Sequence, residues 1–236
     1  MRPAAGHRAL LVRHAQASFG AADYDRLSPR GERQADLLGT WIAAHPELRL
    51  QRLVRGTQRR HAQTLDAVVR ACRAAGRAAP EAEVDADWDE FDHTALFQAY
   101  AARHRDDARV ALLRADPAAM SVRGLIGDIL DAWRSGRLDD AMPERWDGFA
   151  ARAQRAFGTL AGGPATSLVI SSGGVIARCA QAALGLDDVR TIALNLGLAN
   201  SAVSDFRHRG TGWDLQVWNA LPHLAAAEHL PLATHF

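Results

Sequence analysis

The feature that most constrains this chain is an apolar run that ends abruptly in a charged pair. Leu10, Leu11 and Val12 lead directly into Arg13 and His14, and a loop rich in small residues follows as far as Gly20. This pattern predicts a buried strand that delivers both side chains to the carboxyl edge of a sheet, where open α/β folds place their ligands. The planar fork of arginine suits a phosphate group, and an imidazole can carry a phosphoryl group.

Strand-like and helix-like segments alternate at both ends of the chain. Apolar runs predict strands over 9–13, 49–54, 83–85, 167–171, 200–206 and 215–218, and helical spacing predicts helices over 29–45, 57–72 and 175–184. Residues 94–160 show a helical pattern and no convincing strand, which predicts a helical insertion over the sheet edge. We therefore expect one α/β domain over residues 1–236, with helices on both faces of its sheet.

Composition excludes several classes of protein. The formal net charge is only +1, so no global field favours nucleic acid or a membrane surface. No apolar run reaches the ~20 residues of a membrane span, and the first eight residues lack a secretory pattern. Cys72 and Cys179 fall in helix-like apolar patterns and are expected to be reduced core residues, which suits the cytoplasm. All 28 basic residues are arginine, so a Schiff-base lysine and a Walker A lysine are excluded.

Three further segments contain chemically useful residues. A basic helix start follows the second predicted strand, and it contains Arg60. Residues 87–93 combine carboxylates with aromatic residues that could shield them and raise a pKa. The predicted strand that ends at Ser171 leads into Ser172, Gly173 and Gly174, where backbone amides at a helix start could approach an anion.

In this order, the four segments resemble the histidine phosphatase (phosphoglycerate mutase-like) superfamily. The resemblance implies a central, mostly parallel sheet in a three-layer sandwich, with the site at the carboxyl ends of the strands. It implies that His14 is the nucleophile, that Arg13 and Arg60 bind phosphate, and that Glu90 is the general acid, with Asp92 as a substitute. Ala15 stands where the family usually has glycine, and residues 56–58 replace a serine-proline-leucine sequence.

The main departure from the family pattern lies at Ser172, which occupies the position of a second histidine that contacts the transferring phosphoryl group. A serine hydroxyl and Gly173 could still contact the phosphate, but loss of one such donor typically costs ~10²–10³ in rate. His93 is the candidate for replacing that histidine, and His61 and His208 are weaker candidates. Gln16, Ser18 and Gly20, in the loop after His14, are expected to support phosphate or substrate binding.

The resulting hypothesis is a phosphomonoester hydrolase that forms a phosphohistidine on a small phosphorylated metabolite. It needs no cofactor, and no sequence pattern indicates a metal site. The alternatives are a weak or inactive phospho-ligand-binding protein, a phosphoglycerate mutase-like phosphotransferase, and a serine hydrolase built on Ser171 or Ser172. A homodimer is one option for the assembly, with tryptophans exposed at its interface, namely Trp133, Trp146 or Trp213.

Overall fold

The computed structural model describes residues 6–18, 23–115, 123–162 and 166–235. Its centre is a six-stranded sheet in the order β3-β2-β4-β1-β5-β6. The strands are β1 (Arg8–Arg13), β2 (Arg52–Arg55), β3 (Ala82–Val84), β4 (Thr166–Ser171), β5 (Val203–His208) and β6 (Trp213–Ala220). The first four strands pair in parallel, whereas β5 and β6 are antiparallel.

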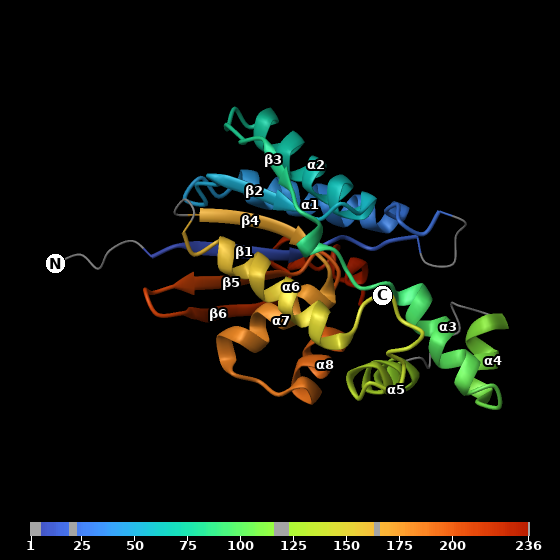
Figure 1. Ribbon diagram of the computed structural model, residues 1–236. Coiled ribbons are helices and arrows are strands. Elements are labelled where there is room, and N and C mark those ends of the chain that lie inside the picture. Colours follow the sequence, from blue (N-terminus) through green and yellow to red (C-terminus); the bar gives the residue numbers. More distant parts are fainter. Residues whose placement is uncertain (1–5, 19–22, 116–122, 163–165, 236) are drawn as a thin grey trace.

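Helices cover both faces of this sheet, which confirms the predicted α/β fold (Figure 1). One face is covered by α1 (Pro29–Ala43) and α2 (Arg59–Ala74), and the other by α6 (Trp146–Thr159), α7 (Gly173–Leu184) and α8 (Asp188–Gly197). Alternate residues of β1 explain the two layers, because Leu10 and Val12 pack toward α1 and α2 while Ala9 and Leu11 join the opposite core.

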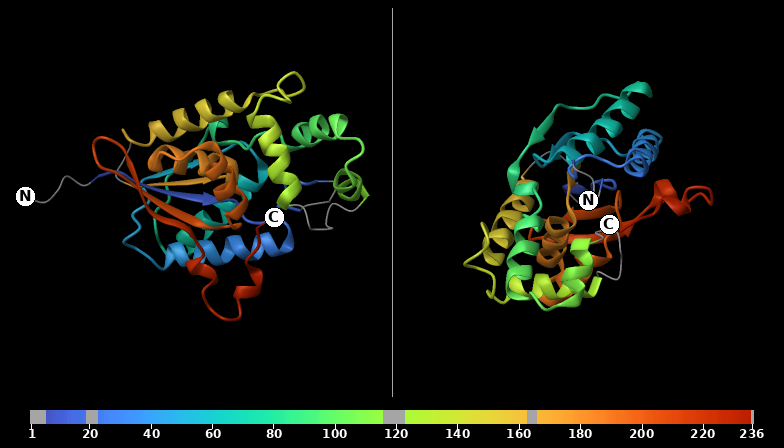
Figure 2. Two further views of the ribbon diagram at one scale, coloured as in Figure 1. Left: turned by 90° about the horizontal axis from the view of Figure 1, so that it is seen from below. Right: turned by 90° about the vertical axis from the view of Figure 1, so that its right-hand side faces the viewer.

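Three helices lie beyond the carboxyl ends of β1 and β4, as Figures 1 and 2 show from different sides. They are α3 (His93–Arg103), α4 (Ala108–Ala115) and α5 (Arg123–Arg134). These three helices and α6 are the regular elements in the described part of residues 94–160, and no strand forms there. This placement sets a helical layer over the sheet edge at which the parallel strands end.

Local chemistry explains where the elements begin. The Ser28 side chain accepts a hydrogen bond from the Gly31 amide at 3.0 Å, and Pro29 is the first residue of α1, as the sequence predicts. Helix α7 begins at Gly173, two residues before the predicted start, because the Ser172 carbonyl already accepts from the Ile176 amide at 3.1 Å. Helix α8 was not predicted.

The two cysteines are buried and free, as predicted, and they lie in the cores on opposite faces of the sheet. The expectation of surface tryptophans is wrong for Trp133 on α5 and for Trp146 at the start of α6, which are both buried among aromatic side chains. Trp213 is half-buried. None of the helices formed by the described residues is both long and apolar enough to cross a membrane.

Candidate active site

His14 lies immediately after β1 and is almost fully buried. Its backbone amide continues the pairing of β1 with β4 by donating to the Ser171 carbonyl at 2.8 Å. The ring Nδ1 lies 2.7 Å from the Ala15 carbonyl oxygen, and Nε2 lies 3.2 Å from Nε of Arg60. Because a carbonyl only accepts and a guanidinium only donates, the proton belongs on Nδ1 and the lone pair on Nε2.

The surroundings of His14 also keep its ring neutral. Burial lowers the pKa of His14 well below its usual value, and the positive charges of Arg60 and Arg13 lower this pKa further. The contact with the Ala15 carbonyl acts in the opposite direction and is smaller in its effect. At neutral pH the site therefore holds an imidazole with a free electron pair on Nε2, which is the form that a nucleophile needs.

Arg60 is the second residue of α2, and all three of its guanidinium nitrogens have partners. Nε donates to His14, Nη1 donates to Asp25 at 2.7 Å, and Nη2 donates to the Gln58 side-chain oxygen at 2.8 Å. The side chain is buried, whereas Asp25 is exposed to solvent. These contacts fix the guanidinium plane beside Nε2 of His14, where a phosphate oxygen could replace the ring as the acceptor.

Arg13 approaches the same position from the end of β1. Its Nη1 donates to the backbone carbonyls of Leu198 and, at 2.7 Å, His235. Nε is buried and has no hydrogen-bond partner in the part of the chain that the structure describes. A Cβ built on Gly173 would lie 3.7 Å from this nitrogen, so the unused donor lies beside the start of α7.

Glu90 reaches the start of α7 from the loop after β3. One carboxylate oxygen accepts from the Gly174 amide at 3.0 Å and the other from the Phe91 amide at 3.3 Å. Burial raises the pKa of Glu90, although the Gly174 amide and the two arginines of the site oppose this rise. The surroundings therefore favour retention of a proton, which a general acid requires.

The alternative acid, Asp92, has a structural contact instead. Its exposed carboxylate accepts from the Ala95 amide at 2.9 Å and caps the N-terminus of α3. His93 is the first residue of α3, and its ring packs on Tyr24 with the ring centroids 4.7 Å apart. The ring of His93 therefore contacts Tyr24, whereas the histidine that contacts Ser172 is His61.

Ser172 is fully buried at the start of α7, and its Oγ lies 2.8 Å from Nε2 of His61. The rings of His61 and His14 have centroids 5.6 Å apart. Among the other weaker candidates, His208 lies at the end of β5, where its ring contacts His7 and Trp213. The structure thus places a second imidazole beside the nucleophile position, from α2.

The loop residues after His14 tie the loop to α1. The Gln16 amide donates to the Gln34 side chain at 2.8 Å, and the Ser28 hydroxyl donates to the Gln16 side chain at 2.9 Å. The Ser18 amide donates to the Arg26 carbonyl at 2.8 Å. Gly20 lies outside the described residues.

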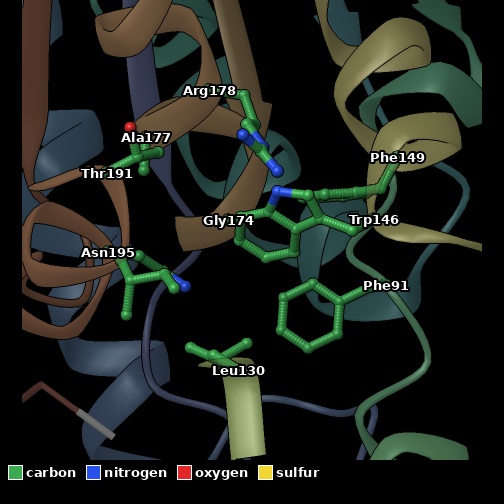
Figure 3. A pocket seen from close by; sticks show the side chains of 10 residues that line it. Phe91, Leu130, Trp146, Phe149, Gly174, Ala177, Arg178, Thr191 and Asn195 are labelled. Carbon is green, nitrogen blue, oxygen red and sulfur yellow. The ribbon is translucent and has the colours of Figure 1, made fainter. Parts of the chain in front are cut away.

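A small pocket is lined in part by Gly174, and its lining is largely apolar and aromatic (Figure 3). The buried Arg178 guanidinium lies 3.8 Å from the centroid of the Trp146 indole and donates to Asp188 at 2.8 Å. The lining residues are Phe91, Leu130, Trp146, Phe149, Gly174, Ala177, Arg178, Thr191, Ile192 and Asn195.

Several contributors to the site were not predicted from the sequence. Gln58 and Asp25 orient Arg60, and the carbonyl of His235 contacts Arg13 from the C-terminal segment. Gln34 links this segment to the loop after His14, because its Nε2 donates to the Leu232 carbonyl at 2.6 Å. No local pattern marks these residues, since each acts through a partner that is distant in the sequence.

Comparison with known proteins supports this assignment of the fold. The model of the histidine phosphatase superfamily (branch 1) matches residues 117–221, a range that does not contain Arg13, His14 or Arg60. Mycobacterial glucosyl-3-phosphoglycerate phosphatase is 20% identical with a TM-score of 0.59, covering 91% of this chain and 99% of its own. It has also been solved with inorganic phosphate and with VO3. A search of curated proteins found no match.

Two further solved structures have the same fold. Phosphoglycerate mutase from Bacillus anthracis is 17% identical with a TM-score of 0.63, covering 92% of this chain and 96% of its own. A mutant phosphoserine phosphatase from Entamoeba histolytica, in complex with phosphoserine, is 14% identical with a TM-score of 0.61, covering 92% and 99%.

The fold is thus that of the phosphoglycerate mutase-like α/β proteins. Together with the family match, this fold confirms the resemblance to the histidine phosphatase superfamily that the sequence predicts. The family match supports phosphatase or mutase chemistry.

Proposed function

We propose that this protein hydrolyses small phosphomonoesters through a phosphohistidine on His14. The observation that supports this most directly is the pair of contacts made by the His14 ring. The Ala15 carbonyl holds the proton on Nδ1, and the Nε2 lone pair faces the Arg60 guanidinium. A nucleophilic nitrogen and a phosphate-binding fork therefore occupy adjacent positions before any substrate is bound.

In the first step, Nε2 of His14 attacks phosphorus in line with the leaving oxygen. The new N–P bond forms as the P–O bond to the leaving group breaks. Nε of Arg60 turns from His14 to a phosphoryl oxygen, and Arg13 offers its unused Nε to another. The two guanidinium groups offset the charge of the phosphoryl oxygens, which is the main requirement of phosphoryl transfer.

Glu90 supplies the proton that the leaving oxygen requires. Its carboxyl group transfers this proton to the departing alkoxide and becomes a carboxylate, which the Gly174 amide stabilises. In the second step, Glu90 accepts a proton from water as the water oxygen attacks phosphorus. The N–P bond breaks, its electron pair returns to Nε2, and inorganic phosphate is released with the site restored.

The experiment is hydrolysis of a small phosphomonoester by wild type and by His14→Ala, with trapping of the phosphohistidine by an alkaline quench, in which its N–P bond is stable. We expect loss of both turnover and the trapped label in His14→Ala. His208→Ala is the matched control, because it removes a histidine at the far end of β5. Unchanged turnover in His14→Ala would exclude the mechanism.

Two other outcomes separate the alternatives. Phosphate binding with no turnover and no trapped label in wild type would indicate a phospho-ligand-binding protein. Isomerisation of 3-phosphoglycerate in the presence of a bisphosphate primer would indicate a mutase.

A further inference from the structure

The candidate active site contains a second buried imidazole that the proposed mechanism does not use. His61 follows Arg60 on α2 and is fully buried. Its Nε2 lies 2.8 Å from Oγ of Ser172, and its ring lies 5.6 Å from that of His14, centroid to centroid. Two residues that are 111 positions apart therefore form a polar pair next to the nucleophile.

The absence of a side chain at Gly56 leaves space for the imidazole of His61. A Cβ at Gly56 would lie 2.4 Å from Nδ1 of His61 and 2.3 Å from a carboxylate oxygen of Asp89, distances that no side chain tolerates. Glycine thus allows Asp89 to approach to 3.8 Å from Nδ1. Asp89 is itself fixed by the Thr57 amide, which donates to it at 2.6 Å.

The hydroxyl of Ser172 contacts His61 and does not cap helix α7. Ser172 is the N-cap residue of α7, yet its side chain accepts no hydrogen bond from the helix backbone. Besides the contact with His61, its Oγ makes a longer contact of 3.4 Å to the Gln58 side-chain oxygen. A serine at this position usually caps its helix, so its pairing with a buried imidazole indicates a different role.

We propose that His61 is a positioning residue that holds the Ser172 hydroxyl as a hydrogen-bond donor to the transferring phosphoryl group. This inference rests on the proposed phosphatase function. A hydroxyl has one proton, so Ser172 can donate to phosphate only if Nε2 of His61 donates to Oγ. The pair would then deliver through a hydroxyl the stabilisation that an imidazole at position 172 would provide directly.

The hydrogen-bond inventory identifies the protonation state that this arrangement needs. With Nε2 donating to Ser172, the ring of His61 carries a proton on Nε2, while Nδ1 lies 3.8 Å from the Asp89 carboxylate and has no hydrogen-bond partner among the described residues. Burial lowers the pKa of His61 well below its usual value, and Arg60 and Arg55 lower it further. The neutral ring with its proton on Nε2 is sufficient for this arrangement, because Nε2 is the atom that faces Ser172.

The charged groups around His61 come from every element that packs on it. Arg60 lies on its own helix, Arg55 ends β2, and Asp89 follows the short 3-10 turn after β3. His14, which is neutral, faces the ring from the end of β1. Asp89 is thus the negative group within ion-pair distance of His61 among these described neighbours.

The first test is a double-mutant cycle on the hydrolysis of a small phosphomonoester. Either His61→Ala or Ser172→Ala should lower kcat about 10- to 100-fold with little change in KM, and the double variant should lose no more than either one. His61→Gln keeps a side-chain N–H donor and should recover part of the loss. Asp66→Asn, on the exposed face of the same helix, should leave kcat unchanged.

The second test exchanges the two positions. Ser172→His alone should lower kcat, because His61 already lies 2.8 Å from Oγ and leaves no space for a second ring. His61→Ala combined with Ser172→His should raise kcat above that of either single variant. Thermal unfolding of each variant identifies any that fail to fold. If His61→Ala fails to fold, His61→Gln replaces it in the double-mutant cycle with Ser172→Ala.

The outcomes separate this inference from the proposed function. Two results would contradict the proposed pairing of His61 with Ser172 while leaving the phosphatase proposal intact, provided that His14→Ala is inactive. One is that the losses of kcat in His61→Ala and Ser172→Ala multiply in the double variant, and the other is that Ser172→His alone raises kcat. If His14→Ala keeps full activity, the phosphatase proposal itself is wrong.

Discussion

Nε of Arg60 and Nε2 of His14 lie 3.2 Å apart, although the two residues are 46 positions apart in the sequence. The strand end holds one and the first turn of α2 holds the other, so the sheet edge brings them together. The guanidinium donates to the lone pair that the proposed reaction requires. Binding of a phosphate oxygen would release it.

The first prediction concerns the protonation of His14. We expect nitrogen NMR to show a neutral ring with its proton on Nδ1 at pH 7, because the Ala15 carbonyl can only accept. Arg60→Met should raise the pKa of His14, since it removes a positive charge that lowers it. The same variant should lower kcat/KM about 10²- to 10³-fold.

Arg59→Met is the matched control for that variant, because Arg59 is exposed and its side chain pairs with Asp23 at the surface. It should leave both the pKa of His14 and the rate near wild type. Equal effects of the two substitutions would contradict the assigned role of Arg60.

The second prediction concerns pH dependence. Glu90 must hold a proton to protonate the leaving group, so kcat should fall as pH rises through its pKa, which burial raises above the usual value. Glu90→Gln should lower kcat about 10²- to 10⁴-fold and remove this basic limb. Asp92→Asn should retain the limb, because asparagine also caps a helix well. A basic limb that persists in Glu90→Gln would identify another acid.

The third prediction tests the close approach of Glu90 to α7. In Gly174→Ala the new Cβ would lie 2.3 Å from Oε1 of Glu90, so the carboxylate must move and activity should fall at least 10-fold, an estimate of about 1.4 kcal/mol in the barrier. Gly158→Ala in α6 meets no atom within 4 Å. That control should keep full activity and gain up to about 1 kcal/mol of stability. Steady-state rates and urea unfolding compare the two.

The fourth prediction links pH to stability through His223, a buried residue behind the site. Its Nε2 lies 2.8 Å from Oγ of Ser201, a residue with φ of 58° whose amide donates to the His14 carbonyl. Burial lowers the pKa of His223 to about 4 in the folded protein, below the ~6.5 of an unfolded chain. Above pH 6.5 both states are neutral. Below it the unfolded state binds the additional proton, so stability falls as pH falls.

The contribution of His223 should reach about 1.4 kcal/mol per pH unit at most between these two pKa values. His223→Gln should remove that part of the pH dependence of urea unfolding between pH 7 and 5. His208→Gln should not, because His208 is only half-buried at the end of β5. Identical slopes for wild type and His223→Gln would contradict the prediction.

The sequence alone determined the layered fold and the residues of its sheet edge. The continuous apolar run of β1 and the Ser-Pro helix start at α1 are local signals, so they were readable without coordinates. The abrupt change from Val12 to Arg13 and His14 located the candidate site for the same reason. Those features depend only on neighbours in the chain.

Only the tertiary structure decided which distant side chains meet. It paired Ser172 with His61, whereas the sequence favoured His93, which packs on Tyr24. It also made Asp92 a helix cap and buried Trp133 and Trp146, which had been expected at the surface. Hydrogen bonds and burial depend on how elements approach in space. Spacing along the chain does not specify that approach.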